Sequence, residues 1–293
     1  MIKSDLKHYR ANENTLIAMS GGRTSAFMLH QVLLAYNYEL PDHIKIIFNN
    51  TGKEMPETLN FVRDIETNWD VKIAWVESYC KPYAGEKKNK KHSYDLKIVN
   101  HETAARNGEP FKQLVDMHDS LPNPVTRYCS GQLKQRASSR YMTRILEWET
   151  PSQCFIGIRA DEHRRAMKIH NTIGEGQDRF CPLFADGITK HDVGEFWANN
   201  DFDLSLPNNK GVTDWGNCDL CFLKSYSKKQ SIINARPYLA DWWVDREKSA
   251  KTAGSGGVFR SDHPNYESMK LIASDGDMFG YEDDKSISCF CGD

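Results

Sequence analysis

An apolar segment followed by a glycine turn and a helical pattern is the feature that most constrains the fold of this chain. Residues 15–19 have the composition of a buried strand, and the six residues SGGRTS at 20–25 follow them directly. Two glycines let the backbone approach a ligand closely, and the first amide N–H groups of a helix have no partner within the helix. The turn therefore predicts a cradle for phosphate or sulfate. The alternative is an ordinary strand-to-helix turn capped by Ser or Thr.

The first half of the chain alternates strand-like and helix-like segments. Segments with the apolar composition of further strands lie at 44–48, 71–76 and 154–158, and 56–69 has the pattern of a helix. Such alternation predicts an α/β fold with a doubly wound, mostly parallel sheet that helices cover on both faces. Because ligands of these sheets bind beyond the carboxyl ends of the strands, we expect Ser20, Asn49 and Arg159 to lie near one another.

Two regions of the chain differ in composition. Residues 1–200 hold the alternating pattern, interrupted by a polar insertion at 80–124, and residues 201–293 form an extension of helices and loops that carries a CxxC motif. At 293 residues, of which 39% are hydrophobic, the chain can bury the core of one large domain with such an appendage. We expect the extension to pack on the first domain.

The charge and hydropathy of the chain restrict its partners. The net charge of −2 gives no overall field for nucleic acid or membranes, so nucleic acid stays open as a partner that the charge does not indicate. Residues 1–14 lack the apolar stretch of a signal peptide, and no apolar run approaches the ~20 residues of a membrane span. We therefore expect a cytoplasmic protein without membrane attachment, and a homodimer stays open as its oligomeric state.

Seven motifs follow one another along the chain. They are SGGRTS at 20–25, FNNTGKEMPET at 48–58, NGEPF at 107–111, TRYCSGQLK at 126–134, GIRADE at 157–162, PLFADGITKHDV at 182–193 and NCDLCFLK at 217–224. In these motifs and their order the chain resembles the phosphoadenosine phosphosulfate (PAPS) reductase family, within the PP-loop ATP pyrophosphatase superfamily, and more narrowly its reductase-like members from phages and prophages. The resemblance implies a PP-loop domain of the adenine nucleotide α-hydrolase type.

The resemblance also implies a nucleotide site. An adenine nucleotide would bind in the loop 20–25 with the loop 49–54 beside its adenosine, and Arg159 and the basic residues after Cys129 would meet its phosphate or sulfate groups. Without the resemblance, those basic residues would equally fit a solvent-exposed charged face. The implied nucleotide-binding residues are Ser20, Gly21, Gly22, Arg23, Thr24, Ser25, Asn49, Asn50, Thr51, Gly52, Glu54, Lys134, Gly157, Arg159 and Arg164.

Two positions in these loops depart from the family pattern. Thr24 stands where ATP-cleaving members usually carry an Asp that helps to hold magnesium. Asn50 stands where Asp before Thr-Gly is common, so one carboxylate contact is missing. Both departures bear on whether ATP or a sulfonucleotide is the substrate.

The spacing of the cysteines indicates a metal site. In a reducing compartment, Cys218 and Cys221 of the CxxC motif point to metal or redox chemistry and not to a disulfide. Resemblance to cluster-bearing sulfonucleotide reductases implies that Cys129, Cys218, Cys221 and Cys289 hold a [4Fe-4S] cluster, although the adjacent cysteine pair usual at the first position is absent. Zinc held by four thiolates is the alternative. For Cys80 and Cys154 we expect buried free thiols.

The resemblance suggests three functions. The leading one is an oxidoreductase that reduces adenylyl sulfate (APS) or PAPS to sulfite, with Arg159 and a cysteine of the tail, Cys291 or Cys289, as catalytic residues and a thioredoxin-like electron donor. A second is adenylation by ATP and magnesium followed by sulfur transfer to a small molecule or nucleic acid, as in DNA phosphorothioation or tRNA thiolation. The third is a non-catalytic nucleotide-binding protein with structural zinc.

Overall fold

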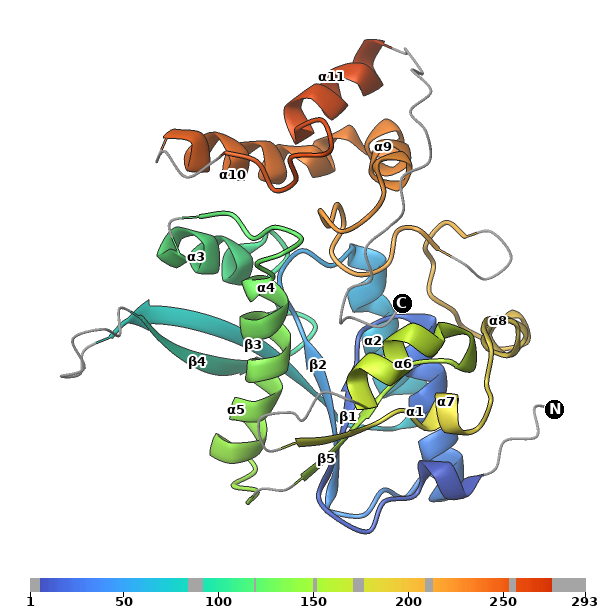
Figure 1. Ribbon diagram of the computed structural model, residues 1–293. Helices are drawn as coiled ribbons and strands as arrows, with labels where there is room; N and C mark the ends of the chain where they lie inside the picture. The colour runs from blue at the N-terminus through green and yellow to red at the C-terminus, as the bar shows by residue number, and fades with distance from the viewer. Residues whose placement is uncertain are drawn as a thin grey trace.

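One six-stranded sheet organises the protein (Figure 1). The computed structural model describes residues 6–83, 92–118, 120–149, 152–170, 177–208, 213–252 and 257–275. The strands are β1 (Thr15–Met19), β2 (Ile44–Asn49), β3 (Ile73–Pro82), β4 (His92–Val99), β5 (Ser152–Ile156) and β6 (Gln177–Phe180). Their order in the sheet is β4-β3-β2-β1-β5-β6, with β4 antiparallel to β3 and the other four pairings parallel. This confirms the predicted α/β fold.

Helices cover both faces of the sheet. They are α1 (Arg23–Ala35), α2 (Pro56–Trp69), α3 (Glu109–His118), α4 (Tyr128–Ser130), α5 (Arg136–Arg144), α6 (His163–His170), α7 (Pro182–Ala185), α8 (Lys190–Ala198), α9 (Tyr226–Ala235), α10 (Ala240–Thr252) and α11 (Tyr266–Asp275). Alternate strand residues face opposite sides. Ile17 and Ile46 therefore join the buried cluster that includes α1 and α2, whereas Leu16 and Ile47 pack with α5. Among the described residues, no helix is long and apolar enough to cross a membrane.

The polar insertion at 80–124 contains more regular structure than the sequence indicates. β3 continues to Pro82, and β4 pairs with it as an antiparallel edge strand. The sequence of β4, HSYDLKIV, mixes polar and apolar residues, which suits a strand at the edge of a sheet. α3 then returns the chain to the core through Phe111 and Leu114.

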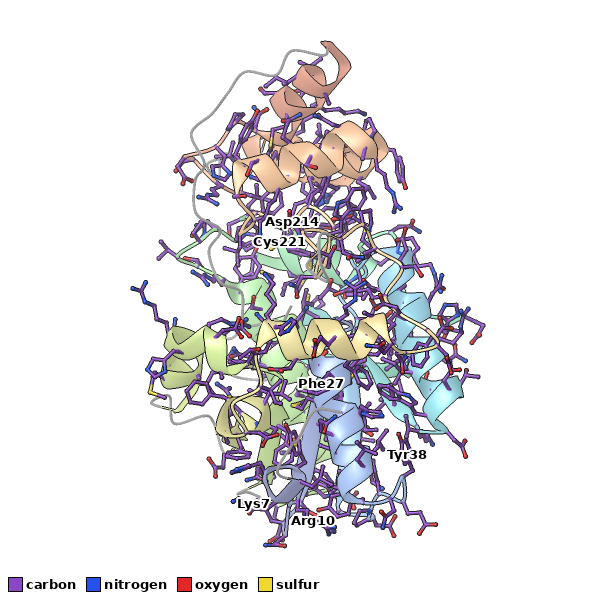
Figure 2. All side chains as sticks on the ribbon, turned by 90° about the vertical axis from the view of Figure 1, so that its right-hand side faces the viewer. Lys7, Arg10, Phe27, Tyr38, Asp214 and Cys221 are labelled. Atoms are coloured by element: carbon purple, nitrogen blue, oxygen red, sulfur yellow. The ribbon has the colours of Figure 1, made fainter. Side chains whose placement is uncertain are left out.

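The helices α9, α10 and α11 form a tail lobe, defined here as residues 213–252 and 257–275, above the carboxyl edge of the sheet (Figure 1). Its centre is aromatic: Trp243 stacks on Tyr266 with ring centroids 5.2 Å apart, and both are buried. Trp243 also belongs to the same buried cluster as Phe27 of α1, so the tail lobe and the sheet domain share one core. Figure 2 shows the segment of Cys221 between the tail helices and the sheet domain.

Candidate functional site

The order of the strands brings the loops after β1 and β5 together. β1 pairs with β2 on one side and with β5 on the other, so the winding of the sheet reverses between β1 and β5. Such a reversal opens a crevice at the carboxyl ends of the strands. The two loops approach closely here, because a Cβ atom on Gly157 would lie 2.9 Å from the Cα atom of Ser25. Gly157 is therefore required for close packing of the two loops.

The loop after β1 is held open by its own hydroxyl groups. Gly21 has φ +79°, and a Cβ atom there would lie 2.5 Å from Cγ2 of Thr58, so only glycine fits. The Ser20 and Ser25 hydroxyl oxygens are 2.9 Å apart, and Ser25 Oγ donates to the Gly22 carbonyl at 3.0 Å. The N-cap of α1 is Gly22, without a side-chain cap. This differs from a turn capped by Ser or Thr and leaves the first N–H groups of α1 to a ligand.

Arg159, from the turn after β5, reaches this loop. Its Nη1 donates to the hydroxyl of Thr24 at 2.8 Å, and its side chain is 11% exposed. Two carboxylates hold the guanidinium in place: Asp161 accepts from Nε at 3.1 Å, and Glu162 lies 3.5 Å from Nη1. A cation therefore sits at the positive end of α1, where the helix dipole and the guanidinium both favour an anion.

The side chain of Arg23 is bonded outside the loop 20–25. Its guanidinium pairs with both oxygens of Asp203, Nε at 2.6 Å and Nη2 at 2.5 Å. Nη2 also donates to the carbonyl of Leu204 at 3.1 Å. The buried Arg23 side chain thus ties α1 to the segment after α8, and only its backbone remains at the cradle.

The loop after β2 lies beside the cradle, since Phe48 pairs with Met19 in the sheet. Asn49 donates from Nδ2 to the Ser138 hydroxyl at 2.9 Å, and none of the described residues donates a hydrogen bond to its buried Oδ1. Asn50 is fully buried, and both atoms of its amide are hydrogen-bonded within the protein. Nδ2 donates to Glu77 at 2.7 Å, and Oδ1 accepts from the Gly52 amide at 3.1 Å. Of the two amides, Asn49 is the one with an acceptor left for a ligand.

The remainder of this loop is bonded to itself and to the tail lobe. The Thr51 amide and hydroxyl both donate to the Glu54 carboxylate at 2.9 Å, and Lys134 Nζ lies 3.7 Å from the same carboxylate. Glu54 also forms an isolated antiparallel bridge with Cys218. Gly52, with φ +78°, accepts at its carbonyl from the Gly108 amide at 2.8 Å. These predicted site residues therefore shape the loop.

A buried ion pair, which the sequence reasoning missed, joins the same loop to the tail lobe. Lys53 Nζ lies 2.7 Å from Asp219, and both side chains are nearly inaccessible. Asp219 also accepts from the indole of Trp243 at 2.8 Å. Both partners lie inside motifs that the sequence had singled out, Lys53 between Gly52 and Glu54 and Asp219 within the CxxC. Their position in the motifs was the only available signal.

The cysteines are brought together only in part. Cys218 and Cys221 are linked by a backbone hydrogen bond of 3.3 Å, and Cys129 lies half-buried in α4. Burial and the Glu54 carboxylate raise the pKa of Cys218 well above its usual value. Within the part of the chain that the structure describes, no three His, Cys, Asp or Glu side chains are grouped to hold a metal ion. The predicted residues Cys289 and Cys291 lie outside the described residues.

The other cysteines behave as expected for buried thiols. Cys80 and Cys154 are buried, and desolvation raises their pKa to about 11 and about 12. Both remain protonated at neutral pH. Arg164, predicted to bind the nucleotide, lies exposed on α6, five residues after Arg159.

Comparisons with known proteins agree with this architecture. Residues 14–206 match the phosphoadenosine phosphosulfate reductase domain. Over 213 residues, the chain is also 28% identical to the "Uncharacterized nin region protein ORF290" of Escherichia phage lambda, and the match covers 73% of this chain and 67% of the phage protein. The domain match contains both loops of the candidate site and Arg159, and it ends before Cys218.

Proposed function

The chain belongs to the phosphoadenosine phosphosulfate reductase family, and on this premise we propose that it reduces a sulfonucleotide, APS or PAPS, to sulfite. The observation that carries the proposal is the contact between Arg159 and Thr24 at the uncapped start of α1. A guanidinium, a helix N-terminus and the hydroxyl groups of the loop together suit a tetrahedral oxyanion. The orphaned acceptor of Asn49 on the next strand suits a donor of the adenosine.

The residue at position 24 favours a sulfonucleotide over ATP. The position where ATP-cleaving relatives carry a magnesium-binding Asp is occupied by Thr24, whose hydroxyl accepts from Arg159. Thr24 thus supplies no carboxylate to a divalent cation. A sulfonucleotide places its sulfate and phosphate groups there without a metal. Adenylation by magnesium-ATP with sulfur transfer is thus the second function that an experiment must separate.

The proposed chemistry begins with a thiolate, assigned to Cys291 with Cys289 as the alternative. The thiolate sulfur attacks the sulfur of the sulfate group, the bond from that sulfur to the bridging oxygen breaks, and the adenosine phosphate leaves with the electron pair. Arg159 offsets the charge that develops on the leaving phosphate. A thioredoxin-like dithiol then reduces the thiosulfonate, becomes a disulfide and releases sulfite.

The metal centre is a separate part of the proposal. A [4Fe-4S] cluster held by Cys129, Cys218, Cys221 and Cys289 needs four thiolates, and the described residues do not group even three of them. Iron and labile sulfide in anaerobically purified protein would support the cluster, and stoichiometric zinc would instead support a structural metal on the same thiols.

The test of the function uses the full chain with PAPS, APS and magnesium-ATP in separate reactions, each with a dithiol donor. Sulfite release from a sulfonucleotide is the expected result. Pyrophosphate release from ATP without sulfite formation would replace the proposal by the adenylation function. Nucleotide binding without any turnover would support the non-catalytic alternative.

A further inference from the structure

The basic side chains of α5 form a continuous stripe. Arg136, Arg140 and Arg144 recur every four residues, so they lie on one face of the helix at intervals of about 6 Å. Arg136 is exposed, Arg140 is half-buried and the Arg144 side chain is 52% exposed. α5 lies across one side of the sheet, and the chain leads into it from Lys134, beside Glu54 (Figure 1). The stripe thus starts near the loop after β2.

Charge on this surface is strongly one-sided. Residues 120–146 contain five Arg or Lys residues and no Asp or Glu, although the whole chain has a net charge of −2. The adjoining hairpin of β3 and β4 adds Lys81, whose side chain is 54% exposed, whereas the exposed Lys97 pairs with the buried carboxylate of Glu77 at 2.8 Å. Asp95 lies 3.3 Å from Lys81 and 3.1 Å from Arg144. One carboxylate therefore serves two cations.

The arginines of the stripe repel one another. Burial and the neighbouring charges of Arg144 and Arg136 lower the pKa of Arg140. Its guanidinium is oriented by neutral partners: Nη2 donates to Gln132 at 2.9 Å, and Nη1 donates to Ser78 at 3.3 Å. Arg140 is thus held by neutral groups beside two like charges, which suits a ligand that brings negative charge.

Aromatic rings lie next to these cations. The guanidinium of Arg140 lies 5.1 Å from the ring centroid of Tyr94. Lys81 Nζ lies 5.8 Å from the ring centroid of Tyr79, which follows Ser78 in β3 and therefore faces the other side of the hairpin. Both rings are only partly buried. Proteins that hold single strands combine a positive groove along the backbone with aromatic rings on which bases stack. An acidic protein would use the cations but not the rings.

We propose that the α5 stripe, together with the β3–β4 hairpin, binds the phosphodiester backbone of a single-stranded nucleic acid. Regular spacing of the arginines matches a ligand whose charges repeat along a chain. This binding is independent of the chemistry at the nucleotide site and goes beyond it. The net charge of the chain conceals the stripe, because the compensating acidic residues lie elsewhere.

The test is fluorescence anisotropy of the full chain with labelled single-stranded DNA, single-stranded RNA and duplex DNA of equal length. The logarithm of the binding constant for a single strand should fall linearly with the logarithm of the salt concentration between about 50 and 200 mM. The variant Arg140→Gln/Arg144→Gln should bind roughly tenfold more weakly and reduce the salt slope by about 1.4, since each lost phosphate contact contributes about 0.7. The two single-stranded probes decide between DNA and RNA.

A matched control removes the same charge elsewhere. Lys248→Gln/Lys270→Gln breaks two exposed ion pairs of the tail lobe, and it should bind the single strand like the unmodified protein. If Arg140→Gln/Arg144→Gln lowers the melting temperature, the single variant Arg144→Gln is used in its place. It should reduce the salt slope by about 0.7, half of the change expected for the double variant. Equal affinity of the stripe variant and the control would overturn the proposal. So would tighter binding of the duplex, or equally effective competition by polyglutamate.

Discussion

The two loops at the centre of the sheet differ in how much of their polar chemistry the fold has used. In the loop after β1, Gly22 caps α1 without a side chain, and Arg159 is held there by two carboxylates. In the loop after β2, the polar groups of Asn50, Thr51 and Glu54 are bonded to neighbouring groups of the protein. The first loop is prepared for an external anion. The second is a joint between the sheet and the tail lobe. Among its described residues, the buried side-chain acceptor that lacks a hydrogen-bond partner is Oδ1 of Asn49.

The largest effect should come from breaking the joint. Lys53→Met leaves Asp219 buried without its cation and should destabilise the protein by about 3–5 kcal/mol. Lys248→Met, which removes one partner of an exposed pair, should leave the stability nearly unchanged. Denaturant unfolding followed by tryptophan fluorescence measures both. Equal stability of the two variants would show that the second loop is not a structural joint.

The next effect concerns the first loop. Arg159→Gln removes the cation at the start of α1 and should lower the rate of sulfite release by roughly 10²–10³-fold. This is the usual cost of removing a hydrogen-bond donor that stabilises negative charge in the transition state. The control is Arg63→Gln, which removes an equal charge from the exposed pair with Asp64 on α2. Comparable rates for the two variants would remove Arg159 from the mechanism.

A smaller effect should separate the two amides of β2. Asn50→Ala leaves the Gly52 amide without its acceptor, removes one of the donors to Glu77 and should destabilise the fold by about 1–3 kcal/mol. Asn49→Ala should instead weaken nucleotide binding by about fivefold, the equivalent of about 1 kcal/mol. Calorimetric titration and thermal unfolding of both variants give the comparison. A reversed pattern would exchange the roles of the two residues.

The smallest effect is a pH dependence of the stability of the protein, caused by a histidine on α1, the helix that follows the first loop. Burial lowers the pKa of His30 on α1 from 6.5 to about 4. Since the unfolded chain binds this proton at higher pH than the native protein, stability should fall as the pH drops from 6.5 toward 4 and should be constant with respect to this group above that range. His30→Phe should flatten the upper part of the decline. Thermal unfolding at a series of pH values provides the measurement. An unchanged decline in the His30→Phe variant would show that His30 does not cause the pH dependence.

Local patterns in the sequence were sufficient for four of the six strands and for the first loop. A buried strand, two glycines and a helix follow one another within Thr15–Ala35, and Gly21 has the positive φ, +79°, that favours glycine. Placement of Arg159 also followed, because the carboxyl ends of parallel strands meet at one edge. These inferences needed strand order but no knowledge of distant side chains.

Interactions between distant residues could not be predicted in this way. Arg23 has the sequence position of a phosphate ligand, but its partner Asp203 lies 180 residues away. Lys53 and Asp219 are likewise far apart in the sequence and meet only because the tail lobe packs on the loop after β2. The edge strand β4 was missed for a related reason, since its mixed polar and apolar composition is typical of surface loops as well.

Amide hydrogen exchange with and without adenosine 3′,5′-bisphosphate tests the difference between the two loops most directly. The account predicts that bound nucleotide protects the amides at the start of α1, residues 22–26, and leaves those of residues 52–54 unchanged, because the latter already have partners or lie in the buried joint. Protection confined to residues 52–54, or no protection at the start of α1 under saturating nucleotide, would contradict it.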